Sequence, residues 1–219
     1  MKKLLFLLLA AASVAGASAQ SDRYTTAMTG RVQALDTTRD IAALNDLSAA
    51  FERIADAEKT QWLPYYYAAL AKINTGYFMS NGKTGGMAAT FDPIADKAEA
   101  LINKADALST DNSEVYVVKK MIASLRMMAD PMSRYMTYGK AAGEALETAK
   151  KLNPENPRVY YLAGQDKFFT PEQYGGSKTE AKSLFELALQ KFDSFRPADA
   201  LAPHWGRGNT EYFLQQASK

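Results

Sequence analysis

Apolar residues recur at spacings of three and four along almost the whole chain after residue 21, which is the periodicity of amphipathic α-helices. The alternating pattern typical of strands is scarce. Residues that start and stop helices separate the periodic segments. The pattern predicts an all-α fold with helices over about residues 22–37, 39–58, 62–80, 92–108, 112–128, 132–151, 157–169, 177–193 and 203–216.

Several of these segments begin with residues that cap helix N-termini. Asp111 is followed by Glu114, and Ser177 by Glu180, which is the spacing of a capping box. Other starts place a capping residue directly before a proline, which suits the first turn of a helix. These are Asp92, Asp130 and Asn156.

One stripe of side chains occurs three times along the chain. A small residue, a large apolar residue and a second small residue follow at spacings of four and three. Small residues seven positions apart lie on one helix face and let a neighbouring helix approach closely, while the large residue between them fills the gap. The three copies are Ala98–Ile102–Ala105, Ala142–Leu146–Ala149 and Ala181–Phe185–Ala188.

The helix after each turn supports the repeat. Tyr65, Tyr116 and Tyr160 lie near the start of a following helix, and Ala69 and Gly164 are small residues four positions further on. Together the stripes, the turns and these aromatic residues resemble the tetratricopeptide repeat (TPR) family, over roughly residues 45–195. The chain departs from that family in its periods of 44 and 39 residues and in Lys120, which stands where a small residue is expected.

The resemblance implies a TPR-like right-handed stack of helical hairpins, an α-solenoid, closed by a capping helix over about residues 203–216 with Tyr212 and Phe213 directed inward. In such arrays the first helix of each pair lines a concave face that binds partners. Carried over to this chain, that face is formed by Tyr66, Leu70, Val117, Met121, Tyr161, Gln165 and Phe168.

The segment Trp62–Leu70 has four aromatic residues in its first six positions. A helix turns 100° per residue, so one buried face cannot hold all four rings. Some of them therefore face a groove, a loop or solvent, where Tyr and Met are common in recognition surfaces. The other interpretation, in which the rings fill the core between hairpins, stays equally open.

The first 19 residues have the pattern of a signal peptide: Lys2 and Lys3, an apolar run over residues 4–12, and Ala-Ser-Ala before the cleavage site. We therefore expect an exported protein, periplasmic or secreted, with one all-helical domain over residues 20–219. Because no cysteine follows the apolar run, it is not expected to be a lipoprotein.

Export also changes the charge balance. The full chain has 26 basic and 24 acidic residues, and removal of Lys2 and Lys3 makes the two numbers equal. A neutral chain does not attract nucleic acid through net charge. The lack of cysteine excludes disulfides and thiolate metal sites.

The chain has little catalytic inventory, so we expect no enzyme, no catalytic residues, no metal site and no cofactor. His204 is the only histidine, and Asn81–Gly86 lacks the first glycine of a phosphate-binding loop. The methionines between Met121 and Met136 are interpreted as adaptable core filler rather than a copper site.

The sequence therefore predicts a non-enzymatic binding module or scaffold, engaged in protein–protein interaction, that holds a peptide or protein partner on its concave face. The alternative is a small-molecule-binding accessory protein of an envelope transport system, suggested by the many tyrosines around Trp62–Tyr77. A third interpretation is self-association through the same aromatic face.

Overall fold

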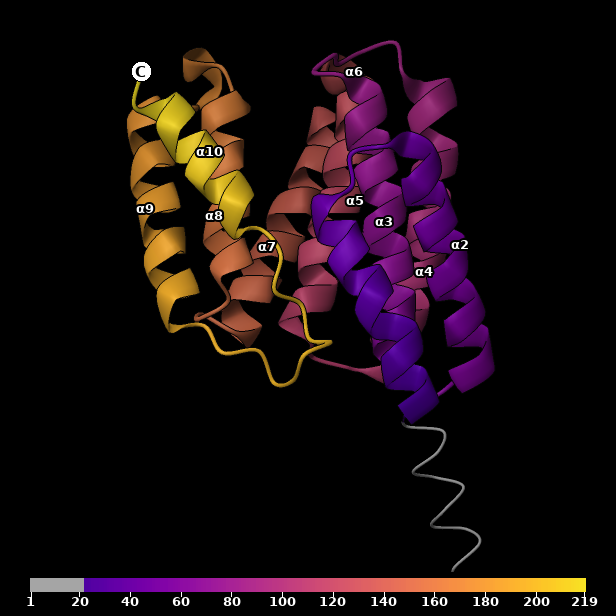
Figure 1. The fold of residues 1–219 in the computed structure, drawn as a ribbon. Helices are drawn as coiled ribbons and strands as arrows, with labels where there is room; N and C mark the ends of the chain where they lie inside the picture. The colour runs from indigo at the N-terminus through magenta and orange to yellow at the C-terminus, as the bar shows by residue number, and fades with distance from the viewer. Residues whose placement is uncertain (1–21) are drawn as a thin grey trace, which may run out of the picture.

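The computed structural model describes residues 22–219, and in this part of the chain all regular secondary structure is helical, with no strand (Figure 1). The predicted signal peptide lies outside the described residues. The elements are an N-terminal helix over residues 22–37, α2 (Ile41–Glu58), α3 (Trp62–Ser80), α4 (Ala88–Leu108), α5 (Ser113–Ala129), α6 (Pro131–Arg134), the π-helix Tyr135–Gly139, α7 (Lys140–Leu152), α8 (Pro157–Phe169), the 3₁₀-helix Glu172–Tyr174, α9 (Lys178–Ser194) and α10 (Arg207–Ala217).

The helices form two groups. The N-terminal helix and α2–α5 form one, α8–α10 form the other, and α7 lies between them (Figure 1). Long helices that are near one another in the sequence pack together: α3 with α4, α5 with α7 across the short α6 and the π-helix, and α8 with α9. The connection over residues 195–206 leaves α9, runs towards the N-terminal group, and returns to α10. We call this segment the strap.

The three repeated stripes pack as the sequence predicts. All nine of their side chains are buried, and each stripe lies on the second helix of a pair, α4, α7 or α9. Gly164 of α8 packs directly against the ring of Phe185 in α9. The predicted all-α fold is thus confirmed, whereas membership of the TPR family stays a prediction.

Three of the predicted helix starts are wrong. Tertiary contacts explain those at Asp92 and before α10. Asp111 is not a cap, because it has a positive φ of 56° and Asn112 caps α5 instead. Helix α4 begins four residues before Asp92, whose carboxylate accepts two hydrogen bonds from Arg134, at 2.6 and 2.8 Å. The last helix begins only at Arg207, because the preceding residues belong to the strap.

The predicted helix over 132–151 contains a π-turn at Tyr135–Gly139. Near this turn Met132 and Met136 are 90% and 79% exposed. The interpretation of these two methionines as core filler is therefore wrong, although Met121 is buried as expected.

We expect Gly164→Ala to destabilise the protein by about 1–3 kcal/mol, because a Cβ there would lie 2.5 Å from Cε1 of the buried Phe185 ring. Gly143→Ala in α7 is the matched control, since its Cβ would meet nothing within 4 Å. That change should stabilise the helix by about 0.5–1 kcal/mol. Urea unfolding of the two variants measures both effects; equal effects would refute the close approach of α8 to α9.

Candidate functional site

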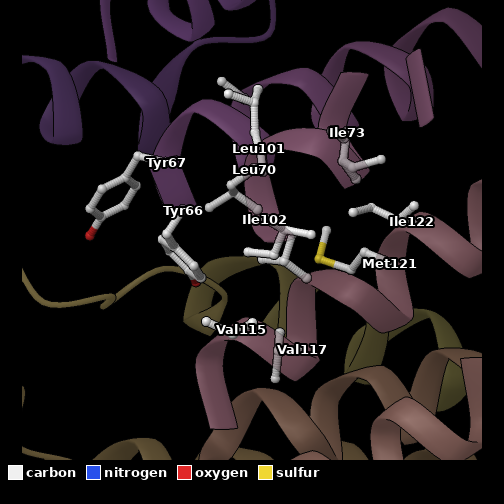
Figure 2. Close-up of a cluster of buried hydrophobic side chains, with 14 of the residues drawn as sticks. Tyr66, Tyr67, Leu70, Ile73, Leu101, Ile102, Val115, Val117, Met121 and Ile122 are labelled. Atoms are coloured by element: carbon white, nitrogen blue, oxygen red, sulfur yellow. The ribbon is translucent and has the colours of Figure 1, made fainter. Parts of the chain in front are cut away.

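Most of the side chains predicted to line a concave face are buried. Tyr66, Leu70, Val117 and Met121 lie in the apolar core among α3, α4 and α5 (Figure 2). Tyr161 is buried as well, whereas Gln165 and Phe168 are partly exposed. Five of the seven residues are thus part of the core, which is the second of the two interpretations that the sequence left open.

Tyr66 has a structural role in a buried polar network. Its hydroxyl donates to Glu114 Oε2 at 3.1 Å and accepts from Trp205 Nε1 of the strap at 2.8 Å. Glu114 Oε1 pairs with Arg158 Nη1 at 2.9 Å and accepts from Asn156 at 2.9 Å. Burial raises the pKa of Glu114, and the charge of Arg158 opposes this rise. The network connects α3, α5, α8 and the strap.

The strap is fixed to the N-terminal group by further contacts. Tyr67 donates to the carbonyl of Leu201 at 2.7 Å, and His204 Nε2 lies 2.8 Å from Asp36 Oδ2. Burial raises the pKa of Asp36, while His204 opposes the rise. The only histidine of the sequence thus has a carboxylate partner, Asp36, in the last turn of the N-terminal helix.

The second helical group has a cluster of six aromatic rings, which we call the aromatic cluster. Neighbouring rings lie with centroids 5.1–6.5 Å apart, in stacked, tilted and edge-to-face pairs. Such distances are those of favourable aromatic contacts. Its members are Tyr161, Phe168 and Phe169 of α8, Phe185 of α9, and Tyr212 and Phe213 of α10.

The aromatic cluster is buried at one side and open at the other. Phe185 is fully buried, Phe168 and Phe213 are partly buried, while Phe169 is 64% and Tyr212 57% exposed. The prediction that Tyr212 points inward is therefore wrong, and that for Phe213 agrees with the structure. Phe169 and Tyr212 each contact the ring of Phe213. Exposed apolar groups gathered around one contact are a recognised sign of a binding surface.

Basic and polar groups lie around the aromatic cluster. Lys178 Nζ lies 5.9 Å from the Phe168 ring centroid. Burial raises the pKa of Tyr161, and both Arg39 and a hydrogen bond with Asn209 oppose that rise. Arg39 itself follows the N-terminal helix and lies over the ring of Phe78 in α3, 5.5 Å from its centroid. Lys178 thus lies beside a ring of the aromatic cluster, and the charge of Arg39 from the other helical group acts on the Tyr161 hydroxyl.

An ion pair between a buried lysine and a half-exposed aspartate joins α5 to α8 near this region. Lys120 Nζ lies 2.6 Å from Asp166 Oδ1, and the Lys120 side chain is almost fully buried. This explains why lysine is tolerated where the repeat pattern expects a small residue. Tyr77 donates to the carbonyl of Met121 at 2.9 Å, and burial raises its pKa, with Asp166 adding to the rise.

Sequence reasoning missed Phe169 and Arg39, and it assigned Phe213 only to a capping helix. The consecutive phenylalanines at the end of α8 were a signal, since a helix ending in two large rings must expose one of them. Nothing in the local sequence indicates that α10 brings Phe213 against them. In the described residues, no group of three or more His, Asp or Glu side chains is placed to hold a metal ion.

The fold and these surfaces define an all-helical protein built of packed hairpins, with an aromatic surface on its second group of helices. The chain is similar to the HusA haemophore from Porphyromonas gingivalis, with 32% sequence identity and a TM-score of 0.77, over 89% of this chain and 92% of that chain. This chain belongs to the same family as that haemophore. No family model matches the chain, and no curated protein matches it.

The similarity corrects the main functional prediction. The expectation of a scaffold that holds a peptide or protein on a concave face is wrong, because the similar protein is a haemophore. The alternative prediction of a small-molecule-binding accessory protein agrees better with this finding. The burial of Tyr66, Leu70, Val117 and Met121 also leaves these side chains no open surface for a peptide.

Proposed function

We propose that this protein is an exported, non-enzymatic carrier of haem. The observation that carries the proposal is the similarity to a haemophore over nine-tenths of both chains. Export is supported by the signal-peptide pattern at the start of the sequence. No helix among residues 22–219 is both long and apolar enough to cross a membrane.

The aromatic cluster is our proposed site of haem binding. Haem is a flat apolar ring system with two carboxylates at one edge, so it needs a broad apolar surface bordered by cations. Phe169 and Tyr212 offer exposed ring faces, and the partly buried Phe168 and Phe213 extend them inward. Lys178 beside Phe168 is positioned to pair with a haem carboxylate.

The proposal is tested by titrating purified mature protein with haemin and following the Soret band. We expect Phe169→Ala to weaken binding about tenfold, because an exposed ring contributes roughly 1.5 kcal/mol when a ligand covers it. Since Phe169 is 64% exposed before binding, its removal should change stability little.

Leu108→Ala is the matched control, as Leu108 is an exposed apolar residue at the end of α4 in the other group of helices. It should bind haemin like the wild type. Absence of any Soret change with the wild-type protein would refute the haem function. Wild-type affinity in Phe169→Ala would instead refute the aromatic cluster as the site.

A further inference from the structure

A hollow lies between the N-terminal helix and α2, in the first group of helices. Its volume is about 290 Å³, which is near the lower end of the range for small-molecule sites. No residue of the aromatic cluster contributes to it. The lining consists of Arg23, Tyr24, Ala27, Arg31, Ala50, Arg53, Ile54, Ala57 and Glu58.

The rim of this hollow is positively charged. The lining contains three arginines, Arg23, Arg31 and Arg53, and one acidic residue, Glu58. All three arginines are exposed. Arg31 Nη1 donates to the carbonyl of Ala27 at 2.6 Å. Within residues 22–219 the ion pairs of arginine involve Arg126, Arg134, Arg158 and Arg207, and none of the three rim arginines.

The floor of the hollow is apolar, and a buried hydroxyl lies behind its lining. Ala27, Ala50 and Ile54 are partly buried and present only carbon atoms from their side chains. The hydroxyl of Tyr24 is buried and has no hydrogen-bond partner in the described part of the chain. A buried polar group without a partner is uncommon in a folded protein and calls for an explanation such as a ligand.

The Tyr24 hydroxyl keeps its proton at physiological pH. Burial raises the pKa of Tyr24 to about 12, and the nearby charges of Asp199 and Glu58 add to the rise. The group therefore remains a hydrogen-bond donor that has no partner in the described part of the chain, on a residue that lines the hollow.

We propose that this hollow binds a small amphipathic organic anion: a carboxylate or phosphate group on a short apolar body. The guanidinium groups would hold the anion, because their planar donors match both carboxylate and phosphate. The alanine and isoleucine side chains would cover the apolar body, and Tyr24 would donate to the anion. The small volume favours such a molecule over a peptide segment.

Isothermal titration calorimetry on the mature protein tests this site with three probes: decanoate, octyl phosphate and inorganic phosphate. We expect decanoate or octyl phosphate to bind and inorganic phosphate to bind at least tenfold more weakly, because it lacks the apolar body. Preference for decanoate over octyl phosphate would assign a free fatty acid, and the reverse preference a phosphorylated lipid. Binding of none of the probes would overturn the proposal.

Arg53→Gln should weaken binding of the preferred probe about tenfold. Arg196→Gln is the matched control, since it removes the same charge from the strap, outside the hollow. Equal losses of affinity in the two variants would show that binding depends only on the net charge of the protein. That result would overturn the hollow as the binding site. Haemin affinity should be unchanged in Arg53→Gln, and a parallel loss of haemin binding would overturn the separation of the hollow from the haem site.

Tyr24→Phe gives a second test, which distinguishes a role of the hydroxyl in binding from a purely structural role. The variant loses a buried hydroxyl that has no partner, so its melting temperature should equal or exceed that of the wild type. Binding of the preferred probe should nevertheless weaken several-fold. Unchanged binding in this stable variant would overturn the assigned role of the hydroxyl.

Discussion

Replacing Glu114 by alanine should lower the free energy of unfolding by about 3–5 kcal/mol, because it leaves Arg158 as a buried charge without its carboxylate. The Arg158 side chain is fully buried, and in the described residues its Nε and Nη2 atoms already lack hydrogen-bond partners. The rings of Phe192, Phe195 and Trp205 surround it at 5.1–5.9 Å. Urea denaturation followed by circular dichroism measures the loss.

Glu52→Ala is the control for this prediction. Glu52 of α2 also forms an ion pair, with Lys97 of α4, but both side chains are partly exposed to solvent. Loss of such a surface pair costs less than about 1 kcal/mol. A loss in Glu114→Ala no larger than in Glu52→Ala would show that the pair of Glu114 and Arg158 is not the junction between the two groups of helices.

The largest expected effect on function is that of Phe213→Ala, which should weaken haemin binding by about 10- to 100-fold. This range follows from roughly 1.5–3 kcal/mol for the contact area of one aromatic side chain. Phe213 is the member of the aromatic cluster with the most ring contacts, at 5.2–6.3 Å. Its partners are Tyr161, Phe168, Phe169, Phe185 and Tyr212.

Because Phe213 also packs against the buried Phe185, the same substitution should destabilise the protein by about 3 kcal/mol. Phe213→Leu separates the two effects, since leucine restores most of the apolar volume but not the flat ring. We expect the leucine variant to recover stability and to remain defective in the haemin titration. Full recovery of binding by leucine would show that Phe213 supports the fold rather than the ligand.

The sequence was sufficient for the existence of the helices and for the way that hairpins nest, but not for every helix boundary. The hydrogen bonds of a helix join residues four apart, so the apolar spacing and the caps Asn156 and Ser177 are local information. The repeated stripe of small and large residues likewise predicted which face of α4, α7 and α9 would be buried. The only feature of the sequence that suggested a small-molecule ligand was the large number of tyrosines around Trp62–Tyr77.

The buried network that holds the strap, and with it the position of α10, depended on contacts between residues far apart in the chain. Glu114 and Arg158 are separated by 44 positions, and the strap brings Trp205 to Tyr66 across 139. No local pattern distinguishes a tyrosine that fills the core from one that faces a ligand, because both lie on an apolar helix face. For this reason the carried-over residues Val117 and Met121 proved to be core, while Phe169 was missed.

The sequence by itself determined that this protein is all-helical and that its hairpins pack through three equivalent stripes, since short-range periodicity specifies both. Only the tertiary structure decided which aromatic rings remain exposed. The rings of the aromatic cluster come from three helices, and their exposure depends on where α10 is placed after the strap crosses between the two groups. That placement follows from long-range packing and a buried ion pair, and neither is encoded in the spacing of neighbouring residues.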